Sequence, residues 1–545
     1  MSNGILQSLY TDSSLQIEVD KLAPGKISEE ARTLVRKYND TVKTYPPQDL
    51  EKNHRLPKTL MDSFKSMGLF GLSIPKEYGG LGLSLIDYFY VVSVMAEKDM
   101  ALAIVPLAHL SIGMKGILLF GNREQKKKYL TKAASGEMVF AYALTEPKKG
   151  SDAKHIETVA RKSEDGTHYV LNGTKTYITN GGYAGGLTVF AQIEGKENTM
   201  GAFIVETDLD GVSIGKDLPK MGLTVSSTTA VMLKDVKVPA ENLIGEEGDG
   251  FKIAMTILNY GRLGLGAASA GAIRQSVEDM KNRANSREQF GEKISSFELI
   301  QEKIGYAAMR EQSVWAMTAF TASLLEKEPL ANVAIESSHT KLYGTENAWH
   351  VLYDALQVAG GAGYLRTQPY EKRMRDFRVT TVFEGTSEIH TMYPPLSAMR
   401  AISSELNGKN AIGKLFRLLR LYFPGTSLSW LKDLSDPPGR AALGEAKKNI
   451  ALARKLIAKG MGKYGKHISE HQFYLRKITK LSYTAYAIMS VLFLREHPEG
   501  WDSKKCGTDI VLRYLIFDAK EARRIARSKL VEKFEDSKTT MFQCI

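Results

Sequence analysis

HYVLNGTKTYITN, residues 168–180, is the first of four short runs that are rich in β-branched and aromatic residues. The others are LTVFAQIEG (187–195), GAFIVET (201–207) and TAVMLKDVKV (229–238). Asn-Gly, Gly-Gly and Asp-Gly pairs interrupt this part of the chain, as turns do between strands. The pattern predicts a compact antiparallel β-domain over residues 139–244.

Helical periodicity lies on both sides of this β-region. After Ser28, which is a typical N-cap before Glu29 and Glu30, apolar residues recur at three- and four-residue steps. The helical period returns after the β-region and continues to the end of the chain. The predicted fold is α+β and mostly α, with five parts: an N-terminal segment (1–27), an α-helical domain (28–138), the β-domain (139–244), a C-terminal four-helix bundle (245–404) and an additional helical extension (405–545).

The charge of the chain is concentrated in the extension. The 545 residues carry a net charge of +12, from 73 Lys plus Arg against 61 Asp plus Glu. Residues 406–545 hold 27 basic and 13 acidic side chains, a balance of +14, so the rest carries −2. This distribution argues against a nucleic-acid partner, and the extension suits a phosphate-rich surface. With only Cys506 and Cys544, we expect no disulfide framework and no metal site built from several cysteines.

Several common catalytic motifs are missing from the sequence. It has no GxGxxG after a strand, no GxxxxGK[ST] loop, no HExxH and no GxSxG in a strand-turn-helix context. Rossmann, zinc and hydrolytic chemistries are therefore disfavoured. The N-terminus shows neither a signal peptide nor an Arg-rich transit peptide. The apolar stretch 481–494 is shorter than the roughly 20 residues of a membrane span and predicts a buried helix.

Three segments are not explained by packing alone. FAYALTEPKKGSDA (140–153) ends a predicted strand with a loop that can offer N–H groups and hydroxyls to a heterocycle or a phosphate. SREQFGEKISSFELIQ (286–301) places Arg287 near an aromatic residue and a glycine. Residues 355–390 combine a glycine cluster, a basic patch and Glu384 within FEGTS. Taken singly, each segment has a structural explanation that is equally good: a surface turn for the first, a helix cap for the second and a helix-packing glycine cluster for the third.

In this order and spacing, the three segments resemble the acyl-CoA dehydrogenase family over residues 28–400. AHLSIGMKGILLFG (108–121), the run that starts KMGLTVSSTTAV (220–255) and NYGRLG (259–264) support the resemblance. The helical addition that follows the EGTSE motif, together with FGEKISSFELIQEK, is similar to the very-long-chain branch of the family.

The resemblance implies an FAD-dependent enzyme that converts long-chain or very-long-chain acyl-CoA to trans-2-enoyl-CoA in fatty-acid β-oxidation. Glu384, in the EGT motif, would take the α-proton while hydride leaves Cβ for flavin N5. This chemistry needs a desolvated carboxylate and donors for the developing enolate. Some relatives place the base one residue before the Arg of NYGRLG, but that residue is Gly261 here. The alternative for Glu384 is a capping or surface carboxylate.

The resemblance also implies a cofactor site and a substrate site, and no metal ion. The cofactor positions are Tyr142, Leu144, Thr145, Gly150, Ser151, Tyr177, Ile178, Thr179, Arg287, Gln289, Phe290, Gln357, Gly360, Gly361, Thr386 and Glu388. The substrate positions are Ser151, Asn259, Arg262, Phe383 and Gly385. In the family arrangement Arg287 and the Gln357 segment reach across from a second subunit, so a homodimer is implied.

Three departures from the family pattern concern the cofactor. Tyr177 stands where most relatives have Trp beside the flavin ring, so an aromatic face is kept. Lys148 and Lys149 replace small residues, and they are either solvated or attract a nucleotide phosphate. Glu298 stands where many members have Gln near the adenine, and we leave it out of the site.

The extension contains a predicted basic amphipathic helix, AIGKLFRLLRLYF (411–423). Lys414, Arg417 and Arg420 recur at three-residue steps with apolar residues largely opposite, a pattern typical of helices on anionic membranes. Burial against the enzyme body, with solvated charges, is the alternative. The second basic stretch, 445–466, would equally suit packing on the core.

The partner that the resemblance implies is an electron-transfer flavoprotein. Two other functions remain open: an acyl-CoA oxidase that is reoxidised by oxygen, and a respiratory-complex assembly protein that keeps the fold without turnover. We expect a cytoplasmic protein with peripheral contact to the inner face of a membrane, on the mitochondrial matrix side if the chain is a processed eukaryotic protein.

Overall fold

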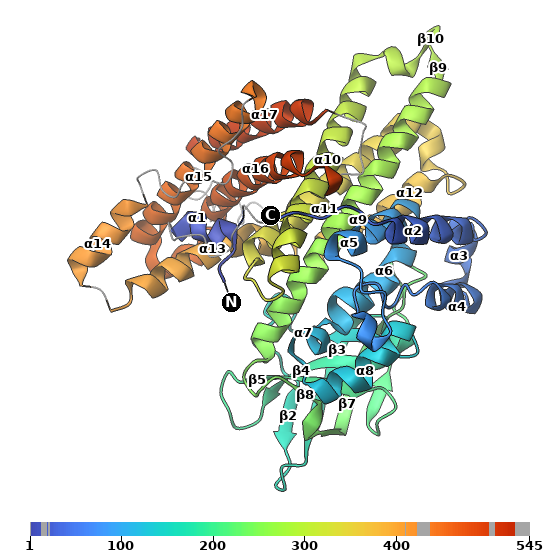
Figure 1. The fold of residues 1–545 in the computed structure, drawn as a ribbon, viewed down its shortest axis with the longest axis vertical. Helices are drawn as coiled ribbons and strands as arrows, with labels where there is room; N and C mark the ends of the chain where they lie inside the picture. The colour runs from blue at the N-terminus through green and yellow to red at the C-terminus, as the bar shows by residue number, and fades with distance from the viewer. Residues whose placement is uncertain are drawn as a thin grey trace, which may run out of the picture. The chain divides into compact units, whose positions relative to one another are not determined.

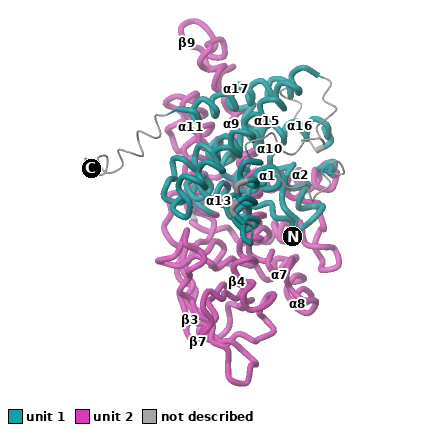
Figure 2. Tube along the Cα trace, turned by 90° about the vertical axis from the view of Figure 1, so that its left-hand side faces the viewer, with its two compact units in different colours: residues 1–26, 305–346, 385–545 teal, residues 27–304, 347–384 magenta. Residues whose placement is uncertain are grey.

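The computed structural model describes residues 2–11, 19, 22–408, 410–421, 436–500 and 507–528 (Figure 1). Cys506, Cys544 and the last two residues of the predicted helix 411–423 lie outside this part of the chain. The chain divides into two compact units, which Figure 2 colours separately. Unit 1 comprises residues 1–26, 305–346 and 385–545, and unit 2 comprises residues 27–304 and 347–384.

Unit 2 begins with a helical part. The Ser28 side chain accepts a hydrogen bond from the N–H of Ala31, and two glutamates occupy the first turn, so the predicted helix start is confirmed. The helices are α2 (Glu29–Val42), α3 (Pro47–Asn53), α4 (Lys58–Ser66), α5 (Leu85–Lys98), α6 (Met100–Ala108), α7 (Lys115–Phe120) and α8 (Arg123–Ser135). Within the described residues, one stretch, Met100–Phe120, has the length and composition of a membrane span, but 83% of its apolar window is buried, as in a core helix.

The middle of unit 2 is an eight-stranded sheet, ordered β6-β7-β3-β2-β4-β5-β8, in which β1 also pairs with β4. Its strands are β1 (Val139–Ala143), β2 (Val159–Lys162), β3 (His168–Thr179), β4 (Ala184–Ile193), β5 (Met200–Glu206), β6 (Val212–Ile214), β7 (Thr228–Pro239) and β8 (Leu243–Ile244). The predicted β-domain is confirmed, but the sheet is not wholly antiparallel, because β1 and β2 run parallel to β4. Parallel pairing requires a long connection, and short-range residue patterns do not encode it.

Alternating side chains build the core of this sheet. In β7, Val231 and Leu233 are buried, whereas the intervening Met232 and the following Lys234 are exposed. Successive side chains of a strand point to opposite faces, so the buried set lines one apolar core. A buried histidine, His109, ties β1 to the helices, since its Nδ1 accepts the N–H of Phe140 at 2.9 Å. Burial lowers the pKa of His109 to about 4, so the ring is neutral at pH 7.

Long helices follow the sheet. The helix α9 (Gly250–Ser286) has 37 residues and is followed by the short strands β9 (Glu288–Gln289) and β10 (Glu292–Lys293). The helix α12 (Pro369–Arg378) also belongs to unit 2. The helices α10 (Glu298–Lys327) and α11 (Ala334–Ala359) pass from one unit to the other.

Unit 1 is helical in all of its described elements. Besides parts of α10 and α11 it contains α1 (Ile5–Thr11), α13 (Ser387–Leu406), α14 (Ala411–Arg420), α15 (Pro437–Tyr464), α16 (Gln472–Glu496) and α17 (Thr508–Arg527). The stretch 481–494 lies in α16 and is almost entirely buried, so the predicted buried helix is confirmed. Phe320 of α10 stacks on Phe493 with the ring centroids 4.4 Å apart, which anchors α16 in the apolar interior.

The two basic stretches of the extension differ in how they pack. In α15, residues such as Ala446, Ile450 and Ile457 are buried, which favours the core-packing alternative for 445–466. In α14, the predicted row of three outward cations is wrong. The Arg417 side chain is only 11% exposed, pairs with Glu405 at 2.6 Å and donates to the carbonyl of Thr11. Arg417 points inward because these two acceptors lie on the side of α14 that faces the rest of unit 1.

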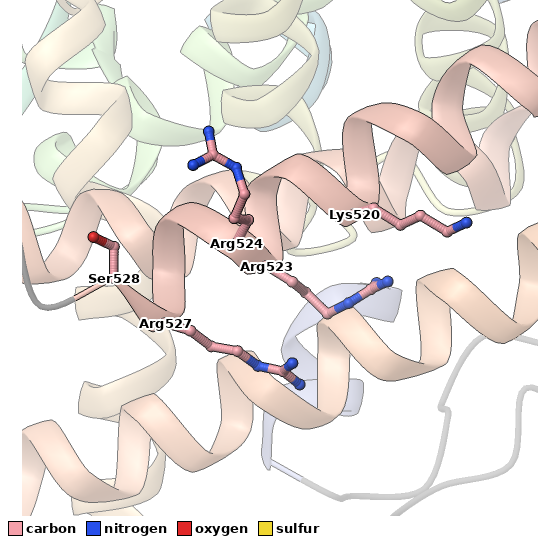
Figure 3. Close-up of a pocket in the computed structure, with 5 residues that line it drawn as sticks. All are labelled: Lys520, Arg523, Arg524, Arg527 and Ser528. Carbon is pink, nitrogen blue, oxygen red and sulfur yellow. The ribbon is translucent and has the colours of Figure 1, made fainter.

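The end of α17 carries part of the positive charge of the extension. A pocket of about 550 Å³ lies there, and Figure 3 shows the residues that line it: Lys520, Arg523, Arg524, Arg527 and Ser528. Arg523 is paired with Glu445 and Arg524 with Glu521. Two of the four cations are therefore partly neutralised, and the pocket is a weaker anion site than its composition alone indicates.

A buried glutamate forms a hydrogen bond with the N-terminal helix of unit 1. Glu336 of α11 is fully buried, and its Oε1 accepts the N–H of Leu6 at 2.7 Å. A Cβ at Gly4 would lie 2.7 Å from both carboxyl oxygens, so only glycine allows this close approach. Burial raises the pKa of Glu336 from 4.5 to about 7, despite the backbone N–H groups that favour the charged form.

We expect Glu336→Gln to flatten the dependence of stability on pH. In the wild type, the folded state holds a proton on Glu336 that the unfolded chain releases, so stability is lost as pH rises from 4.5 toward 7. The shift corresponds to about 3 kcal/mol. Glutamine keeps the acceptor for Leu6 without a charge. Thermal unfolding at pH 5 and pH 8 checks this, and equal pH slopes in the two proteins would contradict it.

Candidate active site

Glu384 lies in a turn with unusual backbone geometry. Its φ is +57°, and that of Gly385 is +96°, so two consecutive residues are in the left-handed region. Non-glycine residues rarely adopt this conformation, which is found most often where function requires it. Glu384 is half-buried, and its Oε2 is shielded from water. These features disfavour the alternative of an ordinary surface carboxylate.

The carboxyl group of Glu384 occupies the space beside Gly261. A Cβ at residue 261 would lie 2.8 Å from the carboxyl carbon of Glu384, and nearer still to its Oε2. Real Cβ atoms do not approach other heavy atoms this closely. Glycine at this position therefore does more than remove an alternative base, since it also makes room for Glu384.

Three predicted residues share this region of unit 2. Asn259 and Arg262 are buried on α9 beside Gly261, and Arg262 Nη1 lies 3.4 Å from Asn259 Oδ1. The Tyr142 hydroxyl, at the end of β1, donates to the carbonyl of Ala254 at 3.3 Å. Burial, and then the charge of Glu384, raise the pKa of Tyr142 well above its usual value, while Arg262 acts in the opposite direction. The structure thus brings Glu384, Arg262 and Tyr142 within electrostatic range of one another in a poorly solvated space.

A buried ion pair that the sequence analysis missed supports the loop 144–151. Lys175 Nζ lies 2.7 Å from Glu146 Oε1 and donates to the carbonyl of Leu144 at 3.2 Å. Both side chains are almost inaccessible to solvent. Burial lowers the pKa of Lys175 to about 8, against the effect of Glu146. Burial pushes the pKa of Glu146 upward, but Lys175 and the hydrogen bonds outweigh it and hold that pKa below its ordinary value. The sequence signal was the lysine inside a predicted strand.

Tyr177 presents its ring to solvent from an irregular point of β3. The pairing of β3 with β7 shifts between Lys175 and Ile178, and Tyr177 has a φ of +57°. Such a bulge changes the direction of a side chain, and Tyr177 is 68% exposed. Ile178 and Leu144 are buried, so only their backbone groups could contact a cofactor. Thr179 is half-buried.

The loop after β1 carries the other predicted residues of this group. The carbonyl of Thr145 accepts the N–H of Thr176 at 2.9 Å, which joins the loop to β3. Gly150 and Ser151 are exposed, and a Cβ at Gly150 would meet nothing within 4 Å. Lys149 pairs with Asp152 at 3.2 Å and Lys148 is exposed, which favours the solvated alternative for both lysines.

A second group of predicted cofactor residues lies far from Glu384. Arg287 follows the last residue of α9, about 37 Å along the helix axis from Arg262 at 1.5 Å per residue. Gln289 and Phe290 lie in the β9-β10 hairpin, and the Phe290 ring is 96% exposed. One chain therefore cannot bring this hairpin to its own Glu384.

The glycine-rich segment after α11 lies at the same end of α9. Arg283 Nη2, in the last turn of α9, donates to the carbonyl of Ala359 at 3.3 Å. Gln357, Gly360 and Gly361 are exposed, and a Cβ at either glycine would meet nothing within 4 Å. The two segments assigned to a second subunit are thus close to each other and distant from the rest of the site.

The remaining predicted residues flank Glu384 in the chain. Phe383 is half-buried, and its N–H donates to the carbonyl of Val379 at 3.0 Å. Within unit 1, the Thr386 hydroxyl caps α13 by accepting the N–H of Ile389 at 3.3 Å. Glu388 is exposed in the first turn of α13.

The residues present fit a flavin nucleotide. An exposed aromatic ring at Tyr177 offers a stacking face for a planar heterocycle, and the open backbone at Gly150 can approach a ligand closely. Among the described residues, no group of three or more His, Cys, Asp or Glu side chains could hold a metal ion.

Sequence comparisons agree with this geometry. The profiles of the acyl-CoA dehydrogenase N-terminal, middle and C-terminal domains match residues 27–137, 141–236 and 248–393. The chain is 38% identical to the very long-chain specific acyl-CoA dehydrogenase, mitochondrial, of Bos taurus, over 82% of this chain and 71% of that protein.

Structural comparisons lead to the same class. The crystal structure of an acyl-CoA dehydrogenase complexed with FAD from Bacillus anthracis has a TM-score of 0.80 and 31% identity, over 98% of this chain and 94% of that chain. A chain in a structure of the electron transferring flavoprotein of Acidaminococcus fermentans has a TM-score of 0.64 and 32% identity, over 68% of this chain and 98% of that chain. The fold and site define an oxidoreductase whose cofactor is FAD. The chain belongs to the acyl-CoA dehydrogenase family.

Proposed function

We propose that this protein dehydrogenates long-chain or very-long-chain acyl-CoA thioesters to trans-2-enoyl-CoA in fatty-acid β-oxidation, with Glu384 as the catalytic base. The observation that carries the proposal is the carboxyl group of Glu384, held in a shielded space that exists because residue 261 is glycine. The similarity to a very long-chain specific relative supports the class of substrate.

Each residue has a distinct part in the proposed reaction. FAD, when bound, supplies the acceptor for the hydride that leaves Cβ of the thioester. Glu384 takes the proton from Cα, and exclusion of water from its Oε2 makes the carboxylate a stronger base. Arg262 and Asn259, buried on the neighbouring helix, orient the acyl-CoA. The Glu146 and Lys175 pair keeps the 144–151 loop in one conformation for the cofactor.

The cofactor site is completed by a second copy of the chain. The hairpin with Arg287 and the segment with Gly360 and Gly361 are exposed and lie too far from Glu384 of the same chain. In a homodimer, these segments of each chain would lie at the cofactor site of the partner chain, close to its Glu384. The exposed ring of Phe290 would then be covered in the assembly.

A series of acyl-CoA substrates, from butanoyl to eicosanoyl, tests the substrate class. Bleaching of the flavin on anaerobic mixing is the readout. We expect the apparent affinity to rise with chain length, since each buried CH₂ contributes about 0.8 kcal/mol. Butanoyl-CoA binding and bleaching as well as the long chains would contradict the long-chain assignment.

The electron acceptor is tested on the substrate-reduced enzyme. We propose an electron-transfer flavoprotein, and the likeness to a chain of the Acidaminococcus fermentans structure supports this kind of partner. Reoxidation should be fast with electron-transfer flavoprotein and slow in air. Rapid formation of peroxide in air would instead assign the protein as an acyl-CoA oxidase.

We also propose that α14 binds an anionic membrane surface from the cytoplasmic or matrix side. Ile412, Phe416 and Leu419 form one exposed apolar face at helical spacing, and Lys414 and Arg420 are exposed near it. This face differs from the predicted one because Arg417 is inside. Lipid headgroups would pair with the two outward cations while the apolar face enters the interface.

Phe416→Glu is expected to weaken co-sedimentation with anionic vesicles at least about tenfold, because it removes roughly 2 kcal/mol of apolar burial and adds a repelled charge. Lys459→Gln, which removes one exposed cation from α15, is the matched control and should bind normally. If Phe416→Glu bound vesicles as well as the wild type, the membrane proposal would be wrong, and α14 would be a helix packed on the enzyme body.

A further inference from the structure

We propose that Lys341 of α11 is a positioning residue that holds the turn bearing Glu384 in its active geometry. Lys341 is fully buried, and its Nζ donates to the carbonyl of Gly385 at 2.8 Å. It does not act on the substrate, but on the peptide group that follows the catalytic base. The inference rests on the proposed function of Glu384.

A second contact from α11 reaches the same turn. Ser338, one helical turn before Lys341, is hydrogen-bonded through its hydroxyl to His390 Nδ1 at 2.7 Å. The His390 ring lies against Gly385, where a Cβ would be 2.8 Å from its Nε2. One face of α11 therefore fixes Gly385 in two ways, by a hydrogen bond to its carbonyl and by the placement of an imidazole ring.

The turn needs such support because its backbone is strained. Glu384 and Gly385 have φ values of +57° and +96°, and a left-handed glutamate relaxes unless its surroundings hold it. A hydrogen bond in a buried site, where the local dielectric is low, is among the stronger means of doing so. If the Gly385 carbonyl turns, the Glu384 side chain leaves the space beside Gly261. A displacement of about 1 Å at a reacting group can cost 10²-fold in rate.

The test compares Lys341→Met with Lys341→Arg and with Thr345→Val in the holoenzyme. Methionine keeps much of the volume and removes the donor, whereas arginine keeps an N–H donor at the end of a long side chain. Thr345 is a buried residue one turn further along α11 whose hydroxyl bonds back to the carbonyl of Lys341, so it controls for damage to the helix. Stopped-flow bleaching gives the rate of dehydrogenation, and equilibrium titration with a non-reducible acyl-CoA analogue gives the affinity.

We expect Lys341→Met to bleach about 30- to 100-fold more slowly with less than a threefold change in analogue affinity and with normal flavin content. The pH profile of its bleaching rate should shift, because the environment of Glu384 changes. Lys341→Arg should recover part of the rate, and Thr345→Val should equal the wild type.

Ser338→Ala keeps the test decisive if Lys341→Met does not fold. It removes only the hydroxyl that orients His390, and we expect a smaller loss of rate, about threefold to tenfold, with the same affinity. Wild-type rates in both variants, or equal losses of rate, affinity and flavin, would overturn the inference and leave Lys341 as a structural residue. Failure of the proposed function is distinguishable, because Glu384→Gln would then bleach normally.

Discussion

Glu384→Gln is expected to give a yellow protein that binds acyl-CoA and bleaches about 10³- to 10⁴-fold more slowly than the wild type. Glutamine has nearly the same shape, so the space beside Gly261 stays filled and the turn keeps its contacts. It cannot accept a proton from Cα, and the shielded position of the carboxylate leaves little room for water to take over. Anaerobic stopped-flow absorbance with a long-chain acyl-CoA measures the rate.

Two comparisons make this result specific. Glu164→Gln, in the exposed turn between β2 and β3, removes a carboxylate of the same unit without touching the site and should bleach normally. A titration with a non-reducible acyl-CoA analogue should show that Glu384→Gln still binds. Normal bleaching in Glu384→Gln would refute the assignment of the catalytic base.

Gly261→Ala is expected to slow bleaching by about 10²-fold while the protein stays folded and yellow. The added methyl group would lie 2.8 Å from the carboxyl carbon of Glu384, so the carboxylate must move away from the position where it meets the substrate. Alanine in a helix interior is otherwise favoured over glycine by about 1 kcal/mol, so stability should not fall steeply.

The control for this substitution is Gly305→Ala. Gly305 lies in α10, where a Cβ would meet nothing within 4 Å, and the change should leave the bleaching rate as it is. If Gly261→Ala bleached at the wild-type rate, the close approach of Glu384 and Gly261 would not be part of the working site.

Local sequence patterns predicted those parts of the fold that depend on neighbouring residues. The helix start at Ser28, the buried helix around 481–494 and the β-strands of the middle region were all confirmed. Capping, apolar periodicity and turn residues act within a few positions of each other, so the sequence displays them directly. The same patterns did not reveal that β1 and β2 run parallel to β4, because direction depends on the long connections between strands.

The candidate site shows the same division. The residue types of the site, including Glu384 and the missing side chain at Gly261, could be recognised in the sequence because each stands in a short motif. The Glu146 and Lys175 ion pair could not, since its partners are 29 residues apart and become a pair only when β3 passes the end of β1. Arg417 likewise looked like an outward cation until its acceptors, Glu405 and Thr11, were placed beside it.

The sequence was thus sufficient for the class of fold, the family and the identity of the candidate base. The tertiary structure was needed for the relations between distant residues: the carboxylate of Glu384 against Gly261, the hairpin of Arg287 at the far end of α9, and Lys341 on the turn of the base. The physical reason is that hydrogen bonds, steric exclusion and burial act over a few ångströms in space, whereas sequence motifs record only closeness along the chain.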